Sequence, residues 1–155
     1  MKTKKWLALM ACLSASFVCA ARRPNFTGDW QFIPEKSKNI GMMMQMSMTE
    51  SIKQTNAAID VKTHTNVQGR EVENQNHFDL LGKEVTNASP MLGPSETVSK
   101  WEGDKLVTTW TSAGAVAGTK TVRTETWSLS PDGKTMTIES VRGSNPPVVM
   151  VFEKK

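Results

Sequence analysis

The feature that most constrains the fold is an alternation of polar and apolar residues that runs, with short interruptions, from Phe26 to the C-terminus. Ile59, Val61 and Val67 share one register of such a stretch, and Met136 and Ile138 share one register of another. Successive side chains of a β-strand point to opposite faces, whereas a helix needs apolar residues three and four positions apart. The sequence therefore predicts strands, because no part of this region carries a helical stripe.

Turn residues divide the alternating region at short intervals. Pro131-Asp132-Gly133 is the clearest case, since Asp starts a turn well and Gly accepts a positive φ at little cost. Glu102-Gly103-Asp104 and Gln68-Gly69 have the same character. The expected strands are 26–32, 42–54, 59–67, 72–80, 84–88, 97–101, 106–110, 120–129, 136–140 and 148–152.

A chain of about nine or ten consecutive antiparallel strands has to protect its edges, and closing the sheet on itself does so best. We therefore expect an all-β fold, an antiparallel up-and-down meander barrel. A two-sheet β-sandwich is the alternative. A barrel of this size encloses either packed side chains or a cavity for a small ligand.

The N-terminus has the pattern of a targeting segment. Lys2, Lys4 and Lys5 precede an apolar run of about 13 residues, and small residues follow up to Ala20. The run is shorter than the roughly 20 residues that a membrane-spanning helix needs. The sequence predicts a signal peptide over residues 1–20, a single domain over 21–155, and a secreted or periplasmic protein. Alternatively, Leu9-Met10-Ala11-Cys12 resembles a bacterial lipobox, which would anchor a lipoprotein through Cys12.

Removal of the predicted signal changes the charge and the cysteine content. The whole chain has 19 Lys and Arg against 15 Asp and Glu, and without residues 1–20 the balance is 16 against 15. The basic excess therefore indicates no nucleic-acid partner. Cys12 and Cys19 leave with the signal, so the mature chain has no disulfide and no thiolate nucleophile. We expect a monomer without a cofactor and without a transmembrane span.

Three short motifs carry a resemblance to a known group. The segment NFTGDWQF, with Gly28 and Trp30, resembles the G-x-W opening strand of lipocalins and intracellular fatty-acid-binding proteins, the calycin group. KWEGDKLV and VMVFEKK resemble late strands of the fatty-acid-binding barrels. The chain as a whole is similar to small secreted lipocalin-like proteins of environmental bacteria. The resemblance implies a barrel that binds an apolar ligand, with Trp30 closing one end.

Two departures from the fatty-acid-binding pattern bear on the ligand. That group has a helix-turn-helix lid after its first strand, and the eight residues from Pro34 to Gly41 are too few for two helices. Many of its members hold a carboxylate with an Arg-x-Tyr pair, and Met150 and Phe152 occupy the matching positions here. The resemblance thus supports the barrel and an apolar ligand more than a carboxylate anchor.

The segment GMMMQMSMTE raises the question of a soft-metal site, because thioethers suit Cu(I). On a strand, however, alternate side chains lie roughly 7 Å apart, too far to share one ion without a bulge. We therefore expect Met44, Met46 and Met48 to line the barrel interior as adaptable apolar residues. A periplasmic Cu(I)-handling protein using Met42, Met44, Met46 and Met48 is the alternative.

The inward register defines the expected ligand-binding surface. It includes two amides, Asn74 and Asn76, which imply a hydrated or ligand-sized interior, since dry burial of an unpaired amide costs about 1–3 kcal/mol. His64 and His77 are expected to face outward. In the strand 120–129, Val122, Thr124 and Thr126 are preferred as the inward set over Arg123, Glu125 and Trp127. The expected lining comprises Met44, Met46, Met48, Ile52, Asn74, Asn76, Phe78, Trp110, Met136, Ile138, Met150 and Phe152.

These features predict an exported, non-catalytic lipocalin-like barrel that binds a small apolar or amphipathic ligand. No G-x-S-x-G elbow is present, and the two histidines are expected outside, so an enzyme is not expected. Besides the Cu(I) hypothesis, a filled barrel acting as a structural or interaction module, possibly lipid-anchored, is the third alternative.

Overall fold

A computed structural model describes residues 23–89 and 93–155 of the chain. Ten strands and two short 3-10 helices make up the fold. Their bounds are β1 Gly28–Phe32, η1 Pro34–Lys36, η2 Gly41–Gln45, β2 Met46–Gln54, β3 Ala58–Val67, β4 Arg70–Asp79, β5 Val85–Ser89, β6 Gly93–Glu102, β7 Lys105–Ala113, β8 Lys120–Leu129, β9 Thr135–Arg142 and β10 Val148–Lys154. Within the described residues no helix is long and apolar enough to cross a bilayer. The predicted signal segment, residues 1–20, lies outside them.

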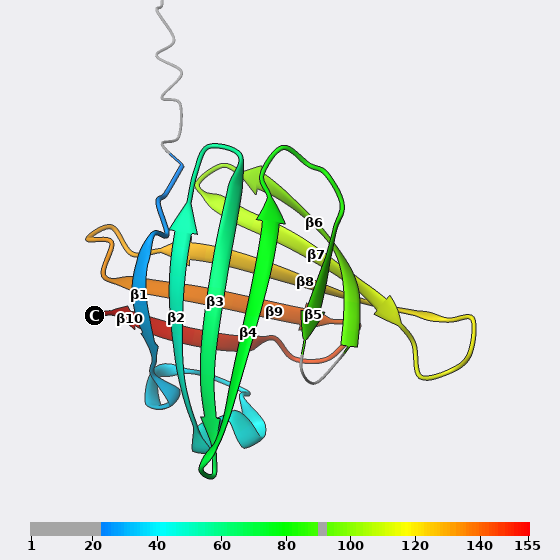
Figure 1. Ribbon diagram of the computed structural model, residues 1–155, viewed down its shortest axis with the longest axis horizontal. Coiled ribbons are helices and arrows are strands. Elements are labelled where there is room, and N and C mark those ends of the chain that lie inside the picture. The colour runs from blue at the N-terminus through cyan, green and yellow to red at the C-terminus, as the bar shows by residue number, and fades with distance from the viewer. Residues whose placement is uncertain (1–22, 90–92) are drawn as a thin grey trace, which may run out of the picture.

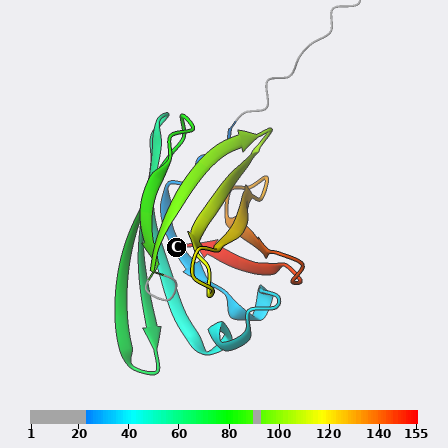
Figure 2. The same cartoon turned by 90° about the vertical axis from the view of Figure 1, so that its right-hand side faces the viewer.

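All ten strands belong to one antiparallel sheet with the order β4-β3-β2-β1-β10-β9-β8-β7-β6-β5. The last strand, β10, pairs with β1, so the two ends of the described chain lie side by side (Figure 1). The sheet curls until β4 and β5, at the two ends of this order, meet. Figure 2 shows the result from the side, with β2–β4 along one wall and β6–β10 along the other. The prediction of an up-and-down barrel is confirmed, and the sandwich does not form.

The start of the second strand differs from the sequence-based prediction. Residues 41–45 form η2, and the strand begins only at Met46. Gly41 has a φ of +53°, and the Met43 backbone N–H donates to the Ile40 carbonyl oxygen at 3.0 Å. The chain has to reverse between β1 and β2, and this reversal uses the first part of the methionine run. Alternation alone could not show where the turn ends and the strand begins.

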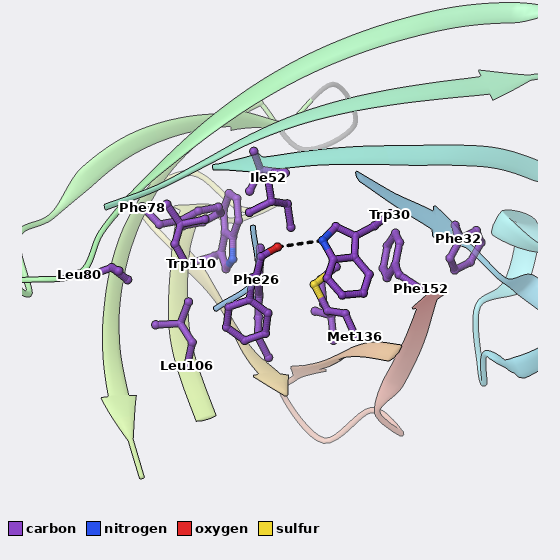
Figure 3. Packing of buried hydrophobic residues seen from close by; sticks show 14 of the residues in the cluster. Phe26, Trp30, Phe32, Ile52, Phe78, Leu80, Leu106, Trp110, Met136 and Phe152 are labelled. Atoms are coloured by element: carbon purple, nitrogen blue, oxygen red, sulfur yellow. Dashed lines mark hydrogen bonds between the residues drawn. The ribbon is translucent and has the colours of Figure 1, made fainter. Parts of the chain in front are cut away.

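An aromatic core fills the interior at the end where the N-terminal segment enters. Phe26 stacks on Trp101 with ring centroids 6.2 Å apart, and Trp127 meets Phe26 edge-on at 5.8 Å. Trp30 is fully buried, and its indole N–H donates to the Phe26 carbonyl oxygen at 2.9 Å (Figure 3). Apolar burial of this kind is the main favourable term in folding. Trp30 is thus part of the buried core, and its role in closing one end of the barrel stays a prediction.

The G-x-W motif has a local physical explanation. Gly28 has a φ of +145°, a conformation that other residues rarely adopt. A Cβ at this position would also lie 2.6 Å from Cε of Lys154 on the adjacent strand β10. The absence of a side chain at Gly28 allows the Lys154 ammonium to lie over the Trp30 ring, 5.3 Å from its centroid.

Side-chain amides hold β4 and β5 together where the barrel closes. Asn87, buried on β5, accepts from the His77 backbone N–H and donates to the His77 carbonyl oxygen, both at 2.8 Å. The same amide donates to the Thr97 hydroxyl at 2.7 Å. The Asn76 amide finds complementary partners when its nitrogen donates to the Ala88 carbonyl oxygen at 3.2 Å. Two amides therefore replace part of a backbone ladder at this seam.

Replacing Asn87 by Ala is expected to lower the free energy of unfolding by about 2–3 kcal/mol. The substitution leaves a backbone donor and acceptor of His77 and the Thr97 hydroxyl without their partner in a buried setting. Urea unfolding followed by circular dichroism measures the change. Asn56→Ala, an exposed amide in the β2–β3 turn, is the matched control. Equal stability of the two variants would contradict a structural role for the seam amide.

Candidate ligand-binding cavity

A cavity of about 290 Å³ lies inside the barrel, at the end bounded by η2 and the β3–β4 turn. Its wall is mainly apolar, with methionine, valine and aromatic side chains. The structure places many of the predicted lining residues on this wall, namely Met46, Met48, Asn74, Asn76, Phe78, Trp110, Ile138 and Met150. They come from β2, β4, β7, β9 and β10, so the cavity exists only because the sheet closes.

Four of the predicted lining residues lie elsewhere. Met44 is on η2 and is 54% exposed, because the strand that would turn it inward starts two residues later. Ile52, Met136 and Phe152 do point inward, but they pack in the hydrophobic core instead of lining the cavity. Aromatic rings fill the interior around them. Inward direction is therefore a property of the strand register, whereas contact with the cavity depends on depth along the barrel.

The most important residue that the sequence reading missed is Glu50. It shares the inward register of Met46, Met48 and Ile52 on β2 and lines the cavity. The sequence does indicate its direction, because alternate residues of a strand point to the same face and Glu50 alternates with Met46, Met48 and Ile52.

The inward face of β8 is the reverse of the preferred prediction. Arg123, Glu125 and Trp127 face the interior, whereas Val122 is 50% exposed. The register explains this result, because Arg123 lies opposite inward-facing Trp110 and Trp127 lies opposite Leu106. The prediction assumed that a charged pair would face water. Arg123 and Glu125 can lie inside because their opposite charges compensate each other.

Arg123, Glu125 and Trp110 form a compact polar cluster on the cavity wall. The Arg123 guanidinium lies 3.2 Å from Glu125 Oε1, and the Trp110 indole N–H donates to Glu125 Oε2 at 2.9 Å. The guanidinium also lies over the Trp110 ring, 4.7 Å from its centroid. Both oxygens of the buried carboxylate thus have partners, which is the condition for tolerating a charge in an apolar interior.

Glu50 is in a different electrostatic situation from Glu125. Burial, and next the negative charge of Glu125, raise the pKa of Glu50 to about 8 from an ordinary value of 4.5, although a hydrogen bond with Thr63 acts in the opposite direction. No cation in the cluster is left to compensate a second carboxylate, since the guanidinium serves Glu125. Glu50 is therefore mostly protonated at neutral pH.

Several buried polar atoms lack a hydrogen-bond partner within the described part of the chain. Those on cavity-lining residues are Glu50 Oε2, Arg123 Nε and Trp127 Nε1. Buried donors and acceptors are nearly always satisfied in folded proteins. All three atoms are enclosed by neighbouring side chains, so they lie within the wall and not on the surface of the cavity.

The structure does not gather the four methionines of the Cu(I) alternative. Met42 is 78% exposed and Met44 is also on the surface, whereas Met46 and Met48 line the cavity. The histidines lie on the outer face, where His77 Nδ1 is 2.6 Å from an oxygen of Asp60 and His64 lies near Glu71 and Glu73. Of the two sites considered from the sequence, the one that the described residues form is the interior cavity.

Comparison with solved structures identifies the fold. Apo lipid binding protein 8 of Caenorhabditis elegans superimposes with a TM-score of 0.64 at 14% identity, covering 84% of this chain and 95% of that protein. The fold is that of the fatty-acid-binding, lipocalin-like calycin barrels. The fatty acid binding protein of Schistosoma mansoni, in complex with arachidonic acid, matches with a TM-score of 0.60 at 14% identity over 84% of this chain and 96% of that one.

Secretory abundant heat soluble protein 4 of Ramazzottius varieornatus also superimposes, with a TM-score of 0.60 at 12% identity over 84% of this chain and 94% of that one. No protein family model matches the sequence, and no curated protein is similar to it in sequence. The likeness to known proteins therefore lies in the arrangement of the strands.

Proposed function

We propose that this protein is a non-catalytic carrier that binds a small apolar or amphipathic ligand inside the barrel. The observation that carries the proposal is the interior cavity of about 290 Å³ with its methionine-rich and aromatic wall. Ligand pockets in proteins are mostly apolar, with volumes of roughly 300–1,000 Å³ and a few polar groups that orient the ligand. The volume is at the small end of this range, which favours a single chain or a small ring system.

The structural neighbours support this proposal by their own properties. One is a lipid binding protein, and another was solved in complex with arachidonic acid. The methionines suit the same role, because their unbranched thioether side chains adapt to ligands of irregular shape. The exposed Met42 lies on η2 beside half-buried Met43, which borders the cavity.

Native mass spectrometry of the purified protein, with displacement of a hydrophobic fluorescent dye, tests the function. A co-purified small molecule or saturable dye binding is the expected result. Dye that does not bind saturably, together with a mass equal to that of the bare chain, would reduce the barrel to a structural role.

Met48→Trp is expected to weaken dye binding by about tenfold or more, because the larger ring occupies the space that the dye needs. Ser47→Trp is the matched control, since Ser47 is the preceding residue of β2 and is exposed on the outer face. The two variants add the same group to the same strand. If Ser47→Trp weakened dye binding as much as Met48→Trp, the dye would not be bound in the cavity.

The proposed carrier is exported as a monomer after cleavage near Ala20, or anchored through a lipidated Cys12. The basic residues and apolar run at the N-terminus motivate this part of the proposal. Intact mass measurement separates the two routes. A chain starting at Ala21 supports the secreted or periplasmic form, whereas an acylated chain starting at Cys12 supports the lipoprotein.

A further inference from the structure

The charges on the cavity wall are already balanced. Arg123 contributes one positive charge and Glu125 one negative charge, and the two side chains are 3.2 Å apart. The Trp110 indole N–H donates a hydrogen bond to the other oxygen of the Glu125 carboxylate. The third ionisable group, Glu50, is the one held in its neutral form. A ligand entering this site therefore meets a cluster with no net charge to neutralise.

The hydrogen-bonding capacity of the wall is not balanced. Arg123 Nε and Trp127 Nε1 are N–H donors without partners, and Glu50 Oε2 is a carboxyl oxygen without one. Trp127 is 3% exposed, so its indole N–H has no access to bulk water. Among the described residues these three atoms are enclosed by neighbouring side chains, so they add no hydrogen-bonding site to the cavity surface, and the cluster of Arg123, Glu125 and Trp110 is the polar part of the wall.

A ligand carboxylate fits this wall poorly. Glu50 shows what the cavity does to a carboxyl group, since burial and the charge of Glu125 keep its pKa near 8. A second carboxylate would meet the same desolvation and the same repulsion, with the guanidinium already paired. An ammonium group would in turn lie near Arg123 and could be compensated only by ionising Glu50. Both charged head groups thus carry a cost that an uncharged one avoids.

We propose that the cavity selects an apolar ligand with an uncharged head group, such as a hydroxyl, over the carboxylate of the same chain, because the Arg123–Glu125 pair on its wall is already balanced. This inference rests on the proposed function and adds the chemical class of the ligand. It separates this barrel from carriers that hold a fatty acid by its carboxylate.

The test compares decanol, decanoate and decylamine, three chains that differ only in the head group, as displacers of the hydrophobic dye at pH 7. Decanol is expected to displace the dye at a concentration about tenfold lower than decanoate, and also lower than decylamine. Decanoate or decylamine as the strongest displacer would overturn the inference and leave the carrier function intact. Failure of all three to displace the dye would overturn both.

Glu125→Gln gives a second, independent measurement on the same site. The amide oxygen can still accept from the Trp110 indole N–H, but Arg123 loses its neutralising partner. The ratio of decanoate to decanol affinity is expected to rise by about tenfold. Glu139→Gln, an exposed residue of β9, makes the same change in net charge and is the control. An unchanged ratio in Glu125→Gln, or an equal rise in both variants, would overturn the inference.

Discussion

Glu50→Gln is expected to stabilise the protein by about 3 kcal/mol at pH 9 and to have almost no effect at pH 4. In the folded protein the pKa of Glu50 is about 8, against an ordinary value of 4.5 that applies to the unfolded chain. Between these values the folded state binds the proton and the unfolded state has lost it. The stability of the wild-type protein therefore falls as the pH rises from about 4.5 to 8.

Glutamine removes this pH dependence because it keeps the shape of the side chain and cannot ionise. Each pKa unit corresponds to about 1.4 kcal/mol, so the difference between 4.5 and about 8 sets an upper limit of about 5 kcal/mol, well above the expected gain. Urea unfolding at several pH values gives the two stability curves. They should meet at low pH and separate as the pH rises, while the exposed control Glu139→Gln follows the wild type. Curves that stay parallel from pH 4 to pH 9 would rule out a buried, protonated Glu50.

Trp30→Ala is expected to lower the free energy of unfolding by about 3–5 kcal/mol. The side chain is fully buried in the aromatic core, and its removal leaves both a cavity and an unpaired Phe26 carbonyl oxygen. A domain of this size has a total stability of roughly 5–15 kcal/mol, so this single change removes a large part of it. Guanidinium chloride unfolding followed by far-UV circular dichroism measures the loss.

Trp101→Ala is the matched control for this prediction. Trp101 also belongs to the aromatic core and stacks on Phe26, but it is only partly buried, and its indole N–H has no partner within the described residues. Its loss should therefore cost less. Trp30→Phe separates the two contributions, because it keeps an aromatic ring and removes the hydrogen bond. Similar costs for Trp30→Ala and Trp101→Ala would contradict the central role of Trp30.

The local pattern of the sequence was enough to predict most of the fold. Each expected strand corresponds to one observed strand, since alternation and turn residues are local properties that survive in any tertiary context. The inward directions of Asn74 and Asn76 on β4 follow from the same alternation. The run from Met42 to Gln45 was misread for the opposite reason. These residues alternate like a strand, but they form η2 because the chain has to reverse direction between β1 and β2.

The chemistry of the interior could be predicted only in part. On β8 both faces contain residues that could lie inside, and the choice between Val122 and Arg123 depends on pairing with β7. Whether a charged residue can face inward depends on a partner, and Glu125 lies on the same strand in the same register. A general preference for exposed charge gave the wrong face, because that preference applies to unpaired groups.

The sequence by itself determined the strands, their turns, the barrel class and the apolar character of the inward register, because these depend on residues close together in the chain. Only the tertiary structure decided which inward residues meet a cavity, how the seam between β4 and β5 closes, and that Glu50 pairs with no cation among residues 23–89 and 93–155. These properties depend on distances between strands far apart in sequence. The raised pKa of Glu50, in particular, results first from burial inside the closed sheet and next from the charge of Glu125, which is 75 positions away along the chain.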